Sequence, residues 1–115
     1  MNGISPQLQN QIAQFQQVQQ QLQAISSQKA QMDSQKREME RTLEELGKSS
    51  GAVYKSVGTL LIKVEDVQAL RSELEESIEL MDVRIGSLAR QESGLRERFQ
   101  SLQETINAAM GRTQA

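Results

Sequence analysis

The residue types that most often perform catalysis are missing from this chain. It contains no histidine and no cysteine, so the usual general base near neutral pH and the usual soft metal ligands are absent. Gly47-Lys48-Ser49 resembles the end of a phosphate-binding loop, but Thr42 stands where the first glycine of that motif belongs, and no predicted strand precedes it. We therefore predict that the protein is not an enzyme and holds neither a metal nor a cofactor.

Charged residues are spread over predicted helix faces and do not form a binding patch. The chain has 13 basic and 15 acidic residues, with a net charge of −2 and a pI near 5.2. Phosphate binding requires concentrated lysine and arginine, so we do not expect nucleic acid as the main ligand. Lys29, Lys36 and Glu92 lie instead inside apolar stripes, where polar residues trade stability for specific pairing. We predict that these three set the register of the helices and discourage other oligomers.

Those stripes occupy residues 8–46 and 67–109, where apolar residues alternate in steps of three and four, the period of a coiled-coil seam. Nine of the 12 seam positions are apolar in the first stretch and eleven of the 13 in the second. At a rise of about 1.5 Å per residue, each helix is on the order of 60 to 65 Å long. Such a helix buries its stripe only lengthwise against a partner. The seam positions are Leu8, Gln11, Phe15, Val18, Leu22, Ile25, Lys29, Met32, Lys36, Met39, Leu43 and Leu46, then Val67, Arg71, Leu74, Ile78, Met81, Ile85, Leu88, Glu92, Leu95, Phe99, Leu102, Ile106 and Ala109.

Helix ends are marked by capping residues. Ser5 before Pro6 predicts an N-cap with proline in the first turn, where its missing N–H is harmless. Gly47 predicts a left-handed residue that ends the first helix after Leu46. Asp66 is placed to cap the second helix, and Gly111 is a plausible stop for it. The sequence therefore predicts helices over residues 6–46 and 66–110.

Residues 52–64, between the two helices, have the composition of a β-hairpin. β-Branched and apolar residues flank Gly58-Thr59, a two-residue signature of a type II′ turn. This turn places Val57 opposite Leu60 and, on the same face, Lys55 opposite Ile62 and Val53 opposite Val64. A lone two-stranded hairpin is marginally stable in water and exposes unpaired strand edges. We therefore expect the hairpin to pair with hairpins of other subunits.

The end of the predicted coil that lies farthest from the hairpin is nearly free of charge. No charged side chain occurs between Met1 and Gln28, and only Glu104 and Arg112 are charged after Arg98. Folding back about the hairpin brings these two segments together. The pairs expected to approach one another are Phe15 with Phe99, Leu8 with Ile106, and Val18 with Leu95.

Two interpretations of this uncharged end are open. Glutamine is a good helix former, so the segment could simply be a stable helix whose apolar residues close the seam. That interpretation leaves Ile4, Ile12 and Met110 unexplained, because they lie off the seam where nothing in the chain covers them. Frayed helix ends expose apolar groups, and flexible apolar surface suits weak binding of varied nonpolar partners. We favour a binding end.

Composition agrees with one elongated domain over residues 1–115. Only 3% of the residues are aromatic and there is one proline, too little for a compact core of ordinary size. No run of 18 apolar residues occurs, and the N-terminus lacks the layout of a signal peptide. We expect a cytoplasmic protein without a membrane partner.

The order of elements and several local sequences resemble the prefoldin family. These are Val53-Tyr54-Lys55 with Val57-Gly58, Leu61-Ile62-Lys63, and a second helix carrying Arg84-Ile85, Leu88, Gln91-Glu92 and Leu95. The chain is most similar to archaeal β-type subunits, and its single hairpin distinguishes it from α-type subunits. The resemblance implies a mainly α fold, a long antiparallel two-helix coiled coil whose hairpin assembles into an intersubunit β-barrel.

The same resemblance implies a function. It indicates a hexamer of two α-type and four β-type subunits that holds non-native client proteins at the coil tips and passes them to a group II chaperonin without hydrolysing nucleotide. Carried onto this sequence, it implies two sets of site residues. The client-binding candidates are Leu8, Ile12, Phe15, Phe99, Leu102, Ile106 and Met110, and the assembly residues are Val53, Val57, Leu60, Ile62 and Val64. The alternative is a structural coiled-coil spacer or tether that oligomerises through its hairpin, for which an uncharged exposed tip is not required.

Overall fold

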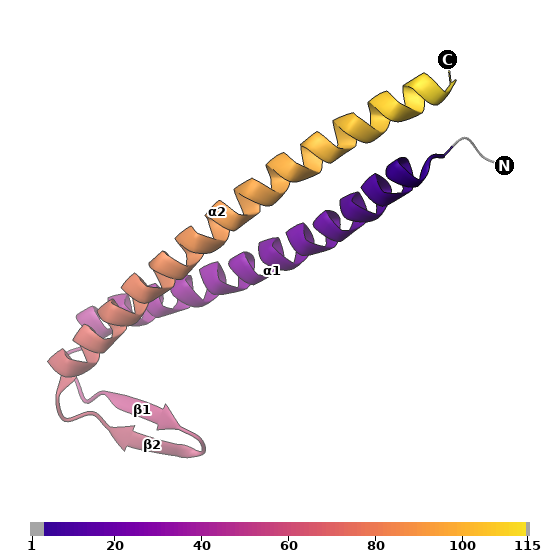
Figure 1. The fold of residues 1–115 in the computed structure, drawn as a ribbon. Helices are drawn as coiled ribbons and strands as arrows, with labels where there is room; N and C mark the ends of the chain where they lie inside the picture. The colour runs from indigo at the N-terminus through magenta and orange to yellow at the C-terminus, as the bar shows by residue number, and fades with distance from the viewer. Residues whose placement is uncertain (1–3, 115) are drawn as a thin grey trace. The chain divides into compact units, whose positions relative to one another are not determined.

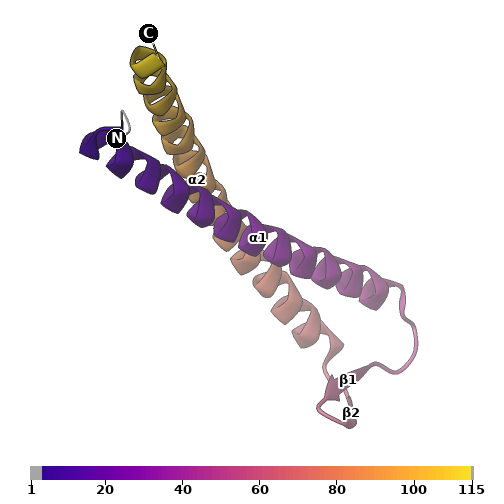
Figure 2. The same cartoon turned by 90° about the vertical axis from the view of Figure 1, so that its right-hand side faces the viewer.

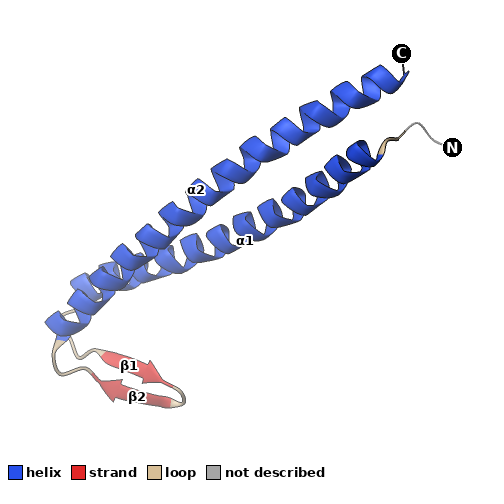
Figure 3. Ribbon diagram, in the orientation of Figure 1, coloured by secondary structure: helices blue, strands red, loops and turns tan. Residues whose placement is uncertain are grey.

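The computed structural model describes the backbone of residues 4–114 and the side chains of residues 4–111. The order of elements is α1 (Pro6–Lys48), β1 (Tyr54–Val57), β2 (Leu60–Lys63) and α2 (Val67–Gln114), as Figures 1 and 3 show. The chain is mainly helical, with two long helices joined by an antiparallel two-stranded hairpin, as predicted. Among the described residues, no helix combines the length and apolar character needed to cross a membrane.

Both helices begin where their capping residues predict. The Leu8 N–H donates to Ser5 Oγ at 3.1 Å, and the Ala69 N–H donates to Asp66 Oδ1 at 3.0 Å. Each cap satisfies one of the backbone donors that the first turn of a helix leaves unpaired. The N-cap assignments of Ser5 and Asp66 are thus confirmed.

The carboxyl ends of the helices differ from the expected positions. The prediction that Gly47 is left-handed is wrong, because Gly58 is the one residue with positive φ in the described chain. α1 continues to Lys48, and the Ser49 N–H still donates to the Glu45 carbonyl at 3.1 Å. α2 likewise passes through Gly111 to Gln114. Glycine permits a left-handed helix end without imposing it, so a glycine near a helix end does not by itself locate that end.

The hairpin has the predicted register. Val57 pairs with Leu60 and Lys55 with Ile62, and the Val64 N–H donates to the Val53 carbonyl at 2.8 Å. Gly58 has φ of +60° and Thr59 does not have positive φ, as a type II′ turn requires. The strands are four residues each, shorter than the predicted hairpin span of 52–64.

The described residues form two compact units: those up to residue 29 together with those from residue 87 onward, here called the terminal unit, and residues 30–86, the hairpin unit. In each unit, a segment of α1 runs antiparallel to a segment of α2 (Figure 2). Every predicted seam position is buried or half-buried, with Val18 and Leu88 among the most covered. This confirms the antiparallel coiled-coil pattern within the units. The single domain and the intersubunit barrel stay predictions.

Candidate functional site

A shallow groove of about 350 Å³ lies between α1 and α2 in the terminal unit, close to the two ends of the chain. We call it the terminal groove. It is lined by Ile12, Phe15, Gln16, Gln19, Gln103, Ile106, Asn107 and Met110. Its position follows from the seam, because Phe15 stacks on Phe99 with ring centroids 4.5 Å apart and sets the helix pairing at this level. The predicted approach of Phe15 to Phe99 is therefore confirmed.

The lining of the terminal groove combines apolar side chains with neutral amides. No charged residue belongs to it, and Met110, with 41% of its surface exposed, forms part of its open rim. Met and Ile side chains gain free energy when they leave water, and Met adapts to partners of different shape. Amides can donate and accept hydrogen bonds without imposing a charge. The groove is therefore suited to apolar, neutral ligands and contains no nucleophile or base for covalent chemistry.

The structure brings four of the seven predicted client-binding residues together. Ile12, Phe15, Ile106 and Met110 all line the terminal groove. The remaining three do not line it: Phe99 stacks on Phe15 and, like Leu102, is half-buried in the seam, and Leu8 has only 5% of its surface exposed. Leu8 could meet a ligand only if the helix ends part. Whether any of the seven contacts a client stays a prediction.

A cluster of polar side chains lies in the seam of the same unit. Glu92 is 5% exposed and accepts hydrogen bonds from Lys29 Nζ at 2.9 Å and from Ser26 Oγ at 2.6 Å. Arg96 adds a longer ion pair to Glu92 at 3.6 Å. The Lys29 ammonium first and the Ser26 hydroxyl second hold the pKa of Glu92 below its ordinary value, against the opposing effect of burial. A satisfied carboxylate of this kind joins the two helices at one register.

The hairpin unit contains a second pair of charges between the helices. Lys36 Nζ lies 2.5 Å from Asp82 Oδ1, and this hydrogen bond raises the pKa of Lys36 above its ordinary value. Asp82 is more than half exposed, so the pair is largely screened by water. The two seam lysines thus have partners in this chain. Their predicted role in excluding other oligomers stays a prediction.

The hairpin carries a second candidate site, an apolar surface that the described part of the chain leaves about half exposed. Val57, Leu60 and Ile62 share one face of the sheet, with 48%, 63% and 48% of their surfaces exposed. Val53 and Val64, at the base of that face, are half-buried. The five predicted assembly residues are therefore close together. About half of the surface of Val57 and Ile62, and more than half of that of Leu60, is exposed and could contact another chain.

Sequence reasoning assigned no role to several exposed apolar residues. Tyr54 and Leu61 project from the opposite face of the hairpin and are 59% and 74% exposed. Leu80 and Val83 are exposed on α2 in the hairpin unit. For Leu80 and Val83 the available signal was a helix position outside the seam, and for Tyr54 and Leu61 it was the alternation of faces along the strands. The absence of charge around Gln16, Gln19, Gln103 and Asn107 was visible in the sequence, but the groove that they line was not.

Known proteins resemble this chain in both sequence and fold. The family model described as Prefoldin subunit matches residues 9–113. The prefoldin subunit beta of Methanocella arvoryzae is 53% identical over 99% of this chain and 91% of its own length. That of Methanosarcina mazei is 44% identical over 94% and 93%. The crystal structure of the prefoldin beta subunit from Thermococcus strain KS-1 superposes with a TM-score of 0.84 at 36% identity, covering 95% of this chain and 96% of that one.

Proposed function

Because the chain belongs to the prefoldin family, a family of chaperones, as a β-type subunit, we propose that it holds non-native proteins with the uncharged ends of its helices. In this proposal it passes those clients to a group II chaperonin without hydrolysing ATP. It works in the cytoplasm and does not use nucleic acid or membrane as a partner.

The observation that carries the proposal is the lining of the terminal groove. Non-native proteins differ in sequence but share exposed apolar side chains and unpaired peptide groups. Apolar side chains such as Ile12 and Met110 match the first feature, and amides such as Gln16 and Gln103 match the second. The absence of charge from this lining avoids repelling clients of either sign. Such a site favours many weak contacts over one tight contact.

The second part of the proposal is assembly through the hairpin. Exposed Val57, Leu60 and Ile62 would be buried against hairpins of other subunits, two α-type and four β-type, in central β-barrels. Barrel formation pairs the free edges of β1 and β2, which a two-stranded sheet leaves open. Several terminal grooves on one particle then act together, and their effective concentration strengthens weak individual contacts.

The test uses the complete hetero-oligomer made with an α-type partner. Residues 1–14 and 100–115 are removed from the β-type chain, and native mass spectrometry establishes that the particle still assembles. Suppression of aggregation of a chemically denatured protein is then measured, together with release of that protein to a group II chaperonin. The proposal predicts loss of suppression with assembly intact. Unchanged suppression would contradict it and would favour the spacer or tether alternative.

A further inference from the structure

A second groove in the terminal unit has the lining of a client-binding site, and we infer that it binds an apolar segment of a non-native polypeptide. This inference rests on the proposed function and extends it to residues outside the terminal groove. The second groove, here called the lateral groove, has a volume of about 530 Å³. It is lined by Gln21, Ala24, Ile25, Gln91, Gly94 and Leu95.

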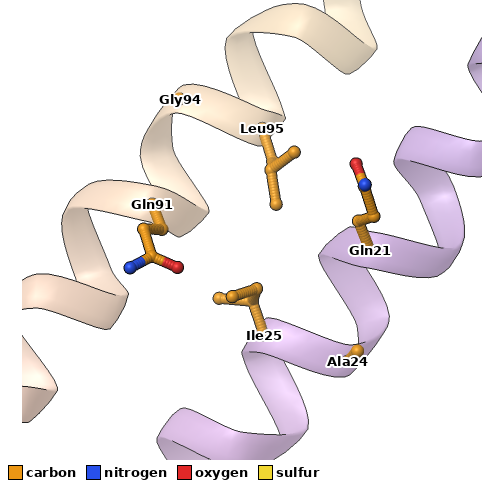
Figure 4. A pocket seen from close by; sticks show the side chains of 6 residues that line it. All are labelled: Gln21, Ala24, Ile25, Gln91, Gly94 and Leu95. Atoms are coloured by element: carbon orange, nitrogen blue, oxygen red, sulfur yellow. The ribbon is translucent and has the colours of Figure 1, made fainter.

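The lateral groove is open because two of its lining residues, Ala24 and Gly94, have little or no side chain. Figure 4 shows Ile25 and Leu95 projecting into the space between the two helices, with Ala24 on α1 and Gly94 on α2 beside them. A Cβ added at Gly94 would meet no atom within 4 Å. Larger side chains at Ala24 and Gly94 would close the groove over the seam. The volume lies in the range of about 300 to 1,000 Å³ that is usual for ligand pockets.

The chemistry of the lining identifies the occupant. Ile25 and Leu95 form an apolar floor, and the amides of Gln21 and Gln91 stand at its sides (Figure 4). Neither amide has a hydrogen-bond partner within the part of the chain that the structure describes. They are free to pair with the peptide groups of an apolar chain laid along the floor. The terminal groove repeats this combination of apolar floor, amide sides and no charge.

A groove of similar size in the hairpin unit has a different lining. It measures about 540 Å³, and Glu40, Glu44, Glu75 and Glu79 surround Leu43 and Ile78. Four carboxylates disfavour an apolar neutral segment, because that segment would strip water from them. The amide-sided lining is thus found in both grooves of the terminal unit and not in this one.

The Glu92 cluster lies immediately beside the lateral groove. Glu92 follows Gln91 in α2, while Ser26 and Lys29 follow Ile25 in α1. These hydrogen bonds hold the helices together next to the groove. A ligand can therefore reach Ile25 and Leu95 in the lateral groove while the helices stay together, whereas Leu8 becomes accessible only when the helix ends part.

Filling the lateral groove tests the inference. Gly94→Leu is introduced into the complete hetero-oligomer, and binding of fluorescently labelled, reduced and carboxymethylated α-lactalbumin is measured by anisotropy. Leucine favours a helix more than glycine, so folding and assembly should be maintained. The new leucine occupies the groove, so the bound protein loses a contact about the size of one aliphatic side chain. Binding should therefore weaken by about tenfold. Ala24→Leu, which fills the groove from α1, should have a similar effect.

Two further variants separate the possible outcomes. Ser101→Leu places the same side chain one heptad further along α2, at an exposed position outside both grooves, and should leave binding unchanged. Met110→Ser tests the terminal groove in the same assay.

If Met110→Ser weakens binding while Gly94→Leu and Ala24→Leu do not, the inference is overturned and the proposed function stands. If no variant weakens binding, the proposed function fails as well. Equal losses for Gly94→Leu and Ser101→Leu would also overturn the inference.

Discussion

Lys29 Nζ lies 2.9 Å from Glu92 Oε1, and both residues are at seam positions that a coiled coil normally fills with apolar side chains. Glu92 is 5% exposed, and its second carboxylate oxygen accepts the Ser26 hydroxyl at 2.6 Å. A buried carboxylate without partners would strongly destabilise the fold. The pairing therefore favours one register of the two helices over any shifted register that separates these residues.

The Glu92 cluster predicts a loss of stability in acid. The pKa of Glu92 is lowered in the folded chain, so its ionised form stabilises the fold above the unfolded pKa of about 4.3. This stabilisation is lost as the pH falls through the lower, folded pKa. Glu92→Gln should therefore lower the melting temperature at neutral pH, and its difference from the wild type should shrink below about pH 4.

The measurement is thermal unfolding by circular dichroism between pH 2.5 and 8. Glu97→Gln serves as the control, because Glu97 is an exposed carboxylate on the same helix without an ion pair in the described chain. It should melt like the wild type at every pH. A difference between wild type and Glu92→Gln that stays constant over the whole range would refute this account of the cluster.

The hairpin predicts that assembly can be broken without unfolding the helices. Ile62→Asp places a carboxylate on the aliphatic face, where burial in a sheet interface costs at least about 2 kcal/mol per subunit. In the isolated chain Ile62 is 48% exposed, so the charge stays in water and the helices are unaffected. Native mass spectrometry should show dissociated subunits, and circular dichroism should show nearly unchanged helix content.

Thr59→Asp, which puts the same charge at the hairpin turn, is the matched control and should still assemble. Loss of helix content together with assembly in Ile62→Asp would show instead that the coil and the oligomer fold as one cooperative unit.

Gly58 predicts a separate, conformational effect on assembly. Its φ of +60° is strained for any residue with a Cβ, although an added Cβ would have open space around it. Gly58→Ala should therefore destabilise the hairpin by about 1 to 2 kcal/mol through backbone strain alone. We expect a lower dissociation temperature of the oligomer with the helix signal of each subunit retained. Gly51→Ala, also in open space but without positive φ, should be neutral. Equal effects of the two substitutions would rule out the turn as the cause.

The local signals in the sequence predicted the elements that have short-range causes. Ser5 and Asp66 cap their helices through backbone donors three residues away, and Gly58-Thr59 sets the hairpin register because the turn type leaves one pairing. The pairing of Phe15 with Phe99 followed from folding the two seams about that hairpin. These predictions needed only spacing and the known geometry of caps, turns and seams.

Features that depend on the exact distance between the helices could not be predicted. The sequence placed Lys29 and Glu92 on the seams but did not pair them, because a shift of one turn changes every partner. The lateral groove depends on Gly94 facing a free volume, and this is visible only with both helices in place. The end of α1 was also missed, because Gly47 is compatible with either a helical or a left-handed backbone.

Site-specific photo-crosslinking shows whether non-native proteins bind at the terminal groove. A photoreactive phenylalanine analogue is placed at Met110, which lines the terminal groove, or at Leu80, which is in the hairpin unit and is more exposed, at 61% against 41%. Each hetero-oligomer is irradiated with a labelled, chemically denatured protein. We predict strong crosslinks from position 110 and few from position 80, despite the greater exposure of Leu80. Equal or stronger crosslinking from position 80 would contradict it.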